Sequence, residues 1–348
     1  MPAAVGGAPK LHDVAERAGV SLGTASNVLN HPERVSPSTI DRVRRAIDEL
    51  GFVRNANASS LAAGGSGSIG LVVISLANSM FVEAARGAQA AARKAGHNLL
   101  LADSVDDFQA QGDNVDSFNE ARVAGLLLAP MQDSAHHIAK LKARGVPVVL
   151  INYDQGDGGQ CTVVVDNEHV GYMAVRHMID IGCHHIAFVA GQDEEYQPVR
   201  MRRSGIHRAF AECGPEVVFE EINVDNIKES NAVEVALEIL DRPSQDRPDG
   251  IIAVTDGLAA SIVNTLCSRG VSIPHEIAVM GCDNNLFASD CVVPLTSIAM
   301  QGYAMGEAAI NLLLAEMVSV DTHVHQRTVL TPELIVRNST MRRETTSR

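Results

Sequence analysis

The chain has 348 residues, of which 46% are hydrophobic, 3% aromatic and 20% charged, and its formal net charge is −14. This composition supplies buried cores and excludes a disordered or collagen-like protein, while the length predicts two or three domains. The negative charge argues against a protein that coats nucleic acid along its whole surface.

The charge is unevenly distributed along the chain. Residues 10–64 carry seven Lys or Arg against six Asp or Glu, a net charge of +1, so the remainder carries −15. A near-neutral head on an acidic body is typical of a small DNA-contacting module whose body is repelled by phosphate.

No membrane span, secretory signal or metal motif is visible in the sequence. No apolar run approaches the ~20 residues of a membrane helix, and residues 1–7 lack the charged and apolar parts of a signal peptide. The six cysteines form no C-x-x-C, and the pairs His136-His137 and His184-His185 point apart on helix or strand. We expect a soluble cytoplasmic protein with reduced cysteines, no metal and no cofactor.

The first expected elements are two short helices. Gly19 ends the first helix, and Ser21 is placed to cap the second with its hydroxyl. Apolar residues at helical spacing form the buried stripe of the first helix: Leu11, Val14, Ala15 and Ala18. In the second helix the inward residues are Ala25, Val28 and Leu29, and the outward residues are Leu22, Gly23, Ser26, Asn27 and Asn30. The arrangement predicts a helix-turn-helix.

A third helix is expected from Ser36-Pro37, a cap followed by a proline in the first turn, to Gly51. Its buried face is expected to hold Ile40, Val43, Ile47 and Leu50. On spacing alone, an ordinary three-helix packing unit remains the alternative to a DNA-binding head.

Residues 55–63 follow, and then the flexible run Gly64–Ser68. Asn55 is placed to cap a short helix, but two turns with small side chains are not stable alone because helix nucleation is costly. We therefore expect a segment that folds only against a partner. A plain linker is the alternative.

From Ile69 onward, short apolar runs alternate with helical stretches. The runs are Ile69–Leu76, Leu99–Ala102, Leu126–Ala129, Val146–Ile151, Ile186–Ala190, Ile251–Val254 and Ile277–Met280. Such runs predict parallel sheets covered on both faces, repeated on either side of Cys161–Gly182 as two Rossmann-like lobes. The helix-like Gly302–Met317 is expected to cross back to the first lobe, and Thr328–Val336 to form a final strand.

Polar residues follow the ends of these runs: Asn78, Asp103, Asn152, Thr255, Asp256 and Asp283. Ligands of open parallel sheets bind outside the carboxyl ends of the strands, so these groups are expected to converge on a cleft between the lobes. Each residue alone is more often a helix cap or a solvated loop residue.

Several motifs match one known family in register. In the head they are the turn at Gly19-Val20, Thr24, Ser26 and Val28-Leu29-Asn30; in the core they are Asp166-Asn167, Arg202–Gly205, Thr255-Asp256, Val279–Asp283 and Pro294–Ser297. Over residues 10–338 the chain closely resembles the LacI/GalR family of bacterial transcriptional regulators. The resemblance implies an α/β protein with a three-helix helix-turn-helix head and a hinge. A two-lobed core of parallel sheets, similar to periplasmic sugar-binding proteins, follows them.

The resemblance also implies which residues contact DNA. The implied set is Ser21, Leu22, Gly23, Thr24, Ser26, Asn27, Asn30, Asn55 and Leu61. Leu22, Gly23 and Asn27 stand at base-reading positions, and Leu61 at the position of a leucine wedge that enters the minor groove. Asn27 replaces a common arginine, and asparagine bonds an adenine edge where arginine favours guanine, so an unusual operator is expected.

For the effector, the family pattern implies Arg202 and Asp283 as the principal polar clamp, with Thr255 and Asp256 on the facing loop. A planar guanidinium opposite an accepting carboxylate suits vicinal hydroxyls, which favours a sugar or a nucleoside. The first lobe is expected to contribute Asn78, Phe81, Asp103 and Asn152.

We therefore expect a homodimeric repressor of operator DNA, not an enzyme, controlled by a small carbohydrate-like effector. Helices Phe81–Ala95 and Gly257–Arg269 are candidates for the dimer face. One alternative is a regulator whose corepressor or protein partner tightens operator binding; a remote one is a cytosolic sugar- or nucleoside-binding protein or enzyme.

The expected domains are a disordered N-terminus (1–9), a head (10–54), a hinge helix and linker (55–68), a core (69–340) and a tail (341–348). Within the core, the first lobe is expected at about 69–166 and 297–327, and the second at about 167–296 and 328–340.

Overall fold

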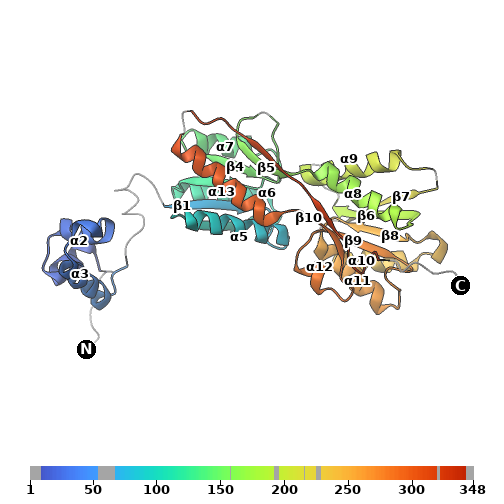
Figure 1. Cartoon of the computed structure of the whole chain (residues 1–348), viewed down its shortest axis with the longest axis horizontal. Coiled ribbons are helices and arrows are strands. Elements are labelled where there is room, and N and C mark those ends of the chain that lie inside the picture. Colours follow the sequence, from blue (N-terminus) through green and yellow to red (C-terminus); the bar gives the residue numbers. More distant parts are fainter. Residues whose placement is uncertain are drawn as a thin grey trace. The chain divides into compact units, whose positions relative to one another are not determined.

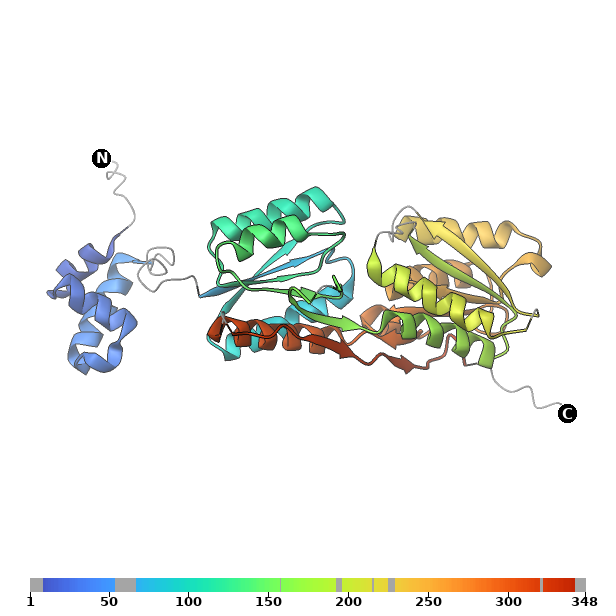
Figure 2. The same cartoon turned by 90° about the horizontal axis from the view of Figure 1, so that it is seen from above.

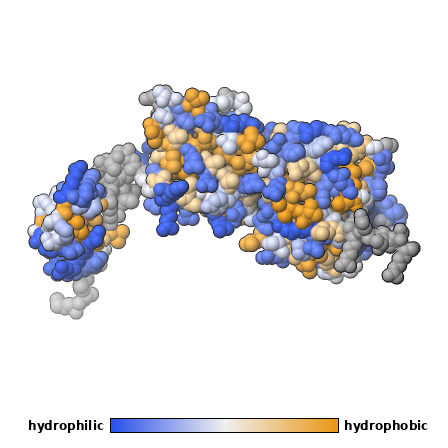
Figure 3. Space-filling view, viewed as in Figure 1, coloured by the Kyte–Doolittle hydropathy of each residue, from blue (hydrophilic) through white to orange (hydrophobic). Residues whose placement is uncertain are grey.

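The computed structural model describes residues 9–53, 67–156, 158–191, 196–214, 216–224, 229–319 and 322–341. The chain divides into two compact units, residues 1–66 and 67–348 (Figure 1). Among the described residues, no helix is both long and apolar enough to cross a membrane. Polar side chains cover much of the surface seen in Figure 3, with apolar patches between them.

The first unit is a three-helix head, as predicted. Its elements are α1 (Leu11–Ala18), α2 (Leu22–Asn30), the short 3-10 helix η1 (Pro32–Arg34) and α3 (Pro37–Leu50). Val14, Val28 and Val43, one from each α-helix, are buried together in its core. Gly19 and Gly51 end α1 and α3 in the left-handed conformation, which glycine adopts without steric cost.

The two predicted serine caps differ. The Ser21 hydroxyl accepts the backbone N–H of Thr24 at 3.1 Å, so this cap is confirmed. Ser36 precedes α3, but its side chain makes no capping bond to the backbone and instead donates to the Thr39 hydroxyl at 2.9 Å. Ser36 is therefore the N-cap residue of α3, as predicted, but its hydroxyl bonds the Thr39 side chain and not the backbone.

The second unit holds two six-stranded sheets, which we call lobe 1 and lobe 2. In lobe 1 the spatial order is β11-β5-β4-β3-β1-β2, with all strands parallel. These strands are β1 (Ser68–Val73), β2 (Asn98–Asp103), β3 (Gly125–Leu128), β4 (Val148–Ile151), β5 (Cys161–Val165) and β11 (Arg327–Leu330). Every residue of β3 and β4 is buried, as the apolar runs predict.

Lobe 2 has the order β12-β10-β9-β8-β6-β7, parallel except for β12, which runs antiparallel to β10. Its strands are β6 (His185–Gly191), β7 (Val218–Val224), β8 (Gly250–Ala253), β9 (Ala278–Asp283), β10 (Thr296–Ala299) and β12 (Glu333–Ile335). The mixed α/β class and the two parallel lobes are thus confirmed.

Helices cover both faces of each sheet. In lobe 1, α5 (Ser79–Lys94) and α13 (Gly302–Val318) pack on one face, and α6 (Phe108–Glu120) and α7 (Ala135–Lys142) on the other (Figure 2). Lobe 2 is covered by α8 (Asn167–Asp180) paired with α9 (Gln197–Ala211), and by α10 (Glu229–Asp241) paired with α11 (Asp256–Ser268). The short elements η2 (Ser244–Asp246) and α12 (Leu286–Asp290) complete lobe 2.

The strands of the C-terminal region differ from those predicted. The return of α13 to lobe 1 is confirmed by its packing on α5. The single strand expected at Thr328–Val336 is instead two strands, β11 in lobe 1 and β12 in lobe 2. Pro332 lies between them, and a proline has no N–H for a continuous ladder. The β10 strand also keeps residues up to Ala299 in the lobe 2 sheet.

Candidate functional site

Helix α2 presents the face that was predicted to point outward. Leu22 is half exposed, at 50%, and Gly23 and Asn27 are exposed, while Ala25 and Val28 are buried. Apolar residues recur at helical spacing on the other face of α2, and that face packs into the small core of the head, so Leu22, Gly23 and Asn27 point outward.

Within α2, hydrogen bonds fix some of these side chains. The Ser21 hydroxyl lies 2.8 Å from that of Thr24, and the Asn30 side chain donates to the Ser26 hydroxyl at 3.1 Å. A methyl group added at Gly23 meets only the Ser21 hydroxyl, at 3.8 Å, so this part of the face is open. Two further predicted contacts, Asn55 and Leu61, lie outside the described residues.

A second candidate site lies where the carboxyl ends of the two sheets meet. Seven described residues other than glycine have a positive φ, and six of them stand at these strand ends. They are Val105 and Asp106 after β2, Asn152 after β4, Asp283 and Asn284 at the end of β9, and Gln301 after β10. Backbone strain of this kind is common at ligand sites. The pattern therefore favours a ligand site at the carboxyl ends of the strands over one at their amino ends.

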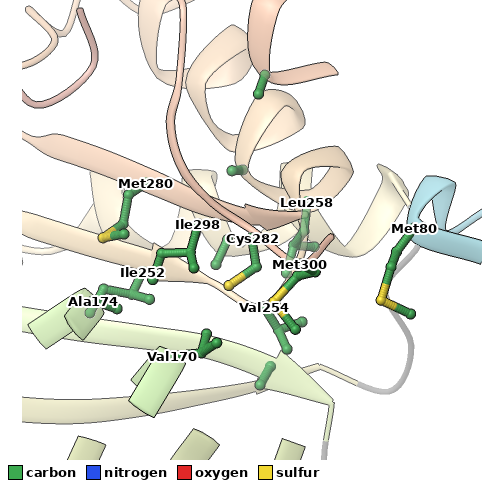
Figure 4. Close-up of a cluster of buried hydrophobic side chains, with 14 of the residues drawn as sticks. Met80, Val170, Ala174, Ile252, Val254, Leu258, Met280, Cys282, Ile298 and Met300 are labelled. Carbon is green, nitrogen blue, oxygen red and sulfur yellow. The ribbon is translucent and has the colours of Figure 1, made fainter. Parts of the chain in front are cut away.

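Arg202, on α9, is buried at this edge with 6% of its surface exposed. Its Nε donates to Asn167 Oδ1 at 2.9 Å, and its Nη1 donates to the Val254 carbonyl at 2.9 Å. The Nη2 atom lies 4.0 Å from the Met300 sulfur, a weak acceptor. Figure 4 shows Val254 and Met300 beside one another in a cluster of buried hydrophobic side chains. Arg202 is therefore held in place while Nη2 keeps capacity to donate.

Two glycines allow this position of Arg202. A methyl group added at Gly171 of α8 would lie 2.0 Å from the Arg202 carbonyl oxygen, and one at Gly205 of α9 would lie 1.8 Å from that of Glu168. Because both positions lack a side chain, α8 and α9 approach closely. The contact brings Asn167, at the start of α8, to the guanidinium.

Asp283, the last residue of β9, carries the least satisfied polar group of the site. Only 9% of its surface is exposed, and both carboxylate oxygens are buried with no hydrogen-bond partner. Burial and the negative charge of Asp256 raise its pKa well above the usual value, although Arg202 and the nearby backbone N–H of Asp256 oppose that shift. A buried, unbonded carboxylate is costly, so Asp283 is poised to accept hydrogen bonds from a ligand.

Asp256 is fully buried, but its two oxygens are already engaged. Oδ1 accepts the Ser297 hydroxyl at 2.6 Å and Oδ2 accepts the Asn285 N–H at 2.9 Å. Burial raises its pKa to about 7, against these hydrogen bonds. Gly281 makes room for this carboxylate, since an added methyl group would lie 2.3 Å from Oδ1. Through these two bonds, Asp256 helps to fix the loop that follows Asp283.

The lobe 1 residues of the predicted set are mostly engaged within the protein. Asn78 Oδ1 caps α5 by accepting the Met80 N–H at 2.9 Å. Asp103 accepts the N–H of Val105 at 2.9 Å and that of Leu76 at 3.3 Å. The fourth lobe 2 residue, Thr255, likewise caps α11 by accepting an amide at 3.3 Å. Phe81 is 2% exposed and belongs to the apolar core.

Asn152 connects the lobes. Its amide donates to the Tyr196 hydroxyl at 3.4 Å, and its carbonyl accepts from Asn167 at 3.3 Å. Close by, the backbone of Asp154 and the side chain of Gln197 exchange two hydrogen bonds, of 2.7 and 2.6 Å. These bonds join the loop after β4 in lobe 1 to the start of α9 in lobe 2.

A cavity of about 390 Å³ opens at Asp283. Its lobe 1 wall is the start of α5 and of α13, with Ser79, Glu83 and Tyr303, and its lobe 2 wall is the segment 283–286. Of the predicted residues Arg202, Asp283, Asp256 and Asn152, only Asp283 lines this cavity. Asn167 bonds both Asn152 and Arg202, and Arg202 and Asp256 both act on the charge of Asp283, so the four residues lie in one interlobe region, while Phe81 lies within the core.

Three polar residues that organise this region were not among the predicted site residues. Asn167 orients Arg202, Ser297 engages Asp256, and Arg337 donates to the Asn284 side chain at 2.6 Å. Asn167 and Ser297 belong to the matched motifs Asp166-Asn167 and Pro294–Ser297, so the sequence could have indicated them as site residues. Arg337 follows β12 without any local pattern.

Comparisons with known proteins relate both units of the chain to known regulators. Residues 10–55 match the family model "Bacterial regulatory proteins, lacI family", and residues 175–340 match "Periplasmic binding protein-like domain". The HTH-type transcriptional repressor PurR of Photobacterium profundum is 32% identical over 94% of this chain and 98% of its own length. Catabolite control protein A of Priestia megaterium is 28% identical over 88% of this chain and 92% of its own.

Solved structures give the same relationship. A complex of the transcriptional regulator CelR with cellobiose superposes with a TM-score of 0.67 at 27% identity, covering 95% of this chain and 99% of that one. The lac repressor dimer bound to operator and an anti-inducer has a TM-score of 0.78 at 24% identity, over 95% and 99% of the two chains.

Proposed function

The chain belongs to the LacI family of bacterial transcriptional regulators, and from that membership we propose how this regulator is controlled. It is a DNA-binding repressor with a periplasmic-binding-protein-like core. A small polyhydroxylated effector, a sugar or a nucleoside, binds between the lobes, anchored by Arg202 and Asp283. The unpartnered, buried Asp283 carboxylate is the observation that carries this proposal.

The chemistry of the anchor favours hydroxyl groups. The raised pKa of Asp283 favours its protonated form in the empty site, which offers one O–H donor and one acceptor oxygen, so this group can both donate to and accept from the hydroxyls of a ligand. The adjacent guanidinium of Arg202 donates to hydroxyl or carbonyl oxygens from a fixed, planar position. The relative CelR, which is described in complex with cellobiose, supports a carbohydrate.

On the DNA side, we propose that α2 enters the major groove and reads bases through Leu22 and Asn27. Asn27 is suited to an adenine edge, and Leu22 to a thymine methyl. The head (10–54) is followed by a hinge (55–68) in which Asn55 and Leu61 contact the minor groove. Two chains pair through α5 and α11 of the core (69–340), so the operator is roughly palindromic.

We propose that the effector and the operator act on one equilibrium of lobe arrangements. Asn152 with Tyr196, and Asp154 with Gln197, are the contacts across the lobes that such a change remakes. A ligand that favours one arrangement weakens or strengthens DNA binding by the same coupling free energy with which DNA affects the ligand. The protein acts on chromosomal DNA in the cytoplasm and binds its effector without converting it.

The test begins with selection of a duplex from a random pool by the full-length protein, followed by titration in rising salt. Selection of a palindromic duplex, for which the affinity of the protein falls as the salt concentration rises, supports operator binding. Adding sugars, polyols, nucleosides or purines should then change the operator affinity at least tenfold for one class. Release identifies an inducer and tightening a corepressor; if no class has an effect, control by a small molecule is rejected.

The hinge role has its own test. Leu61→Ala should reduce operator affinity about tenfold or more, because an inserted apolar wedge is lost, and should leave effector affinity unchanged. Equal loss of both affinities would show that Leu61 supports the fold instead of the DNA contact. Leu22→Ala serves as the comparison, since it removes a major-groove contact outside the hinge.

A further inference from the structure

A second cluster of reactive side chains lies in lobe 1, away from the interlobe site. It consists of Cys161, Glu316, His323 and His325, and one ligand atom of each lies within 4.8 Å of all the others. Cys161 begins β5, Glu316 lies in the last turn of α13, and the two histidines precede β11. In Figure 1 the end of α13 and the start of β11 lie at the same end of lobe 1.

The distances within the cluster are short. The Cys161 Sγ lies 3.0 Å from His323 Nε2 and 3.9 Å from His325 Nδ1. Glu316 Oε2 lies 3.8 Å from the same His325 Nδ1. In a tetrahedral zinc site with the usual ligand distances, neighbouring donor atoms are about 3.3 to 3.6 Å apart. The four donors therefore need only small side-chain adjustments to surround one ion.

The Glu316 carboxylate has an oxygen that no group of the cluster satisfies. Glu316 is only 7% exposed, and its Oε2 is buried with no hydrogen-bond partner. Cys161 is fully buried, and the two histidines are half-buried. Buried carboxylate oxygens are normally paired or bound to a metal. A cation placed among the four groups satisfies this oxygen.

We propose that Cys161, Glu316, His323 and His325 form a binding site for one divalent transition metal ion, with Zn²⁺ as the best match. One thiolate, two imidazoles and one carboxylate are donors that zinc accepts in tetrahedral geometry. The Gln326 N–H donates to the Cys161 sulfur at 3.3 Å. On binding, the thiol releases its proton to solvent and the sulfur coordinates the ion.

The ion would connect three segments that are far apart in the sequence. It joins the start of β5, the end of α13 and the segment leading to β11, all at the amino ends of the lobe 1 strands. β1 also begins at this end, at Ser68, immediately after the hinge. The site therefore braces the edge of lobe 1 at which the chain enters from the DNA-binding head.

The experiment uses the full-length protein after removal of metal with EDTA. One equivalent of Co²⁺ should produce a thiolate-to-cobalt charge-transfer band and the visible bands of a tetrahedral site, and Zn²⁺ should abolish both. Zn²⁺ should also raise the melting temperature. Absence of a charge-transfer band, or a band that Zn²⁺ leaves intact, overturns the proposal.

Variants assign the ligands. Cys161→Ser should remove the charge-transfer band, and His323→Gln and His325→Gln should each weaken Co²⁺ binding at least tenfold. The matched controls are Cys213→Ser, in lobe 2, and His136→Gln, on α7, which should bind as the wild type does. If the serine at the buried position 161 prevents folding, the two histidine variants decide, and wild-type binding by both rejects the site.

Discussion

The two lobes share one architecture but treat the polar residues at their strand ends differently. In lobe 1, Asp103 follows β2 and both of its oxygens accept backbone N–H groups. In lobe 2, Asp283 ends β9 and neither oxygen has a partner. The same residue type at equivalent edges thus closes a loop in one lobe and remains available in the other. From this difference we propose that lobe 2 supplies the polar groups that bind the effector and that lobe 1 covers them.

A second contrast supports this conclusion. Arg202 and Asp256, the charged neighbours of Asp283, are also buried in lobe 2 and are fixed by hydrogen bonds to Asn167 and Ser297. Fixed charges around a vacant acceptor make a preorganised site, because little reordering is needed when a ligand arrives. The four predictions that follow test this contrast.

The largest effect is expected on effector affinity from changes in lobe 2. Asp283→Asn and Arg202→Gln should each lower the affinity for the effector roughly 100-fold or more. Each change leaves a buried polar group of the bound effector without its hydrogen-bond partner. Isothermal titration measures this. The controls are Asp180→Asn and Arg176→Gln, which change an exposed ion pair on α8 and should bind the effector as the wild type does. Wild-type affinity in Asp283→Asn would show that Asp283 does not anchor the effector.

The next effect concerns the helix pair that positions Arg202. Gly171→Ala places a methyl group 2.0 Å from a carbonyl oxygen of α9, so the helices must separate and stability should fall by about 3 kcal/mol. Gly257→Ala is the matched control, since its methyl group meets only Phe287 at 4.0 Å. It should be neutral or slightly stabilising. Denaturant unfolding of both variants distinguishes them, and equal stability would show that α8 and α9 are not in close contact.

A pH effect is expected from the two buried carboxyls of lobe 2. Burial raises the pKa of Asp256 to about 7, and burial together with the negative charge of Asp256 raises that of Asp283 well above its ordinary value. Between about pH 4 and these values the folded protein binds more protons than the unfolded chain, so its stability falls as pH rises. Asp283→Asn should flatten this fall, and its stability relative to wild type should increase from pH 5 to pH 8. Parallel profiles for the two proteins would contradict the assignment.

The smallest effect is expected from the lobe 1 counterpart. Asp103→Asn weakens two bonds to backbone N–H groups and should cost about 1 kcal/mol of stability. Because its oxygens are engaged within the protein, effector affinity should change less than about threefold on the same reasoning. A loss comparable to that of Asp283→Asn would show that the two lobes share the anchor.

Much of this arrangement could be predicted from sequence. The head followed from helical spacing and from Gly19 and Gly51, and the parallel sheets followed from apolar runs such as Leu126–Ala129, because both signals are local. The matched motifs indicated Arg202 and Asp283. These features depend on residues close together in the chain or on patterns of a known family.

The rest depended on contacts between distant segments. β7 was missed because two adjacent glutamates and an asparagine interrupt its apolar residues. Thr328–Val336 contains two strands because its halves pair with different sheets. The engagement of Asp256 by Ser297 is equally nonlocal. The cluster of Cys161 with His323 and His325 spans more than half of the core and has no recognisable spacing, so no motif could reveal it.

The most direct test of the central claim is a thermal-shift screen of wild type and Asp283→Asn against pentoses, hexoses, disaccharides, phosphosugars, polyols, nucleosides and purines. A ligand at 100 times its dissociation constant adds about 2.7 kcal/mol of stability, which gives a clear shift in melting temperature. We predict that one hydroxyl-rich class stabilises the wild type and not the variant. Equal stabilisation of both proteins, or of neither by any class, would contradict the assignment of Asp283 as the effector anchor.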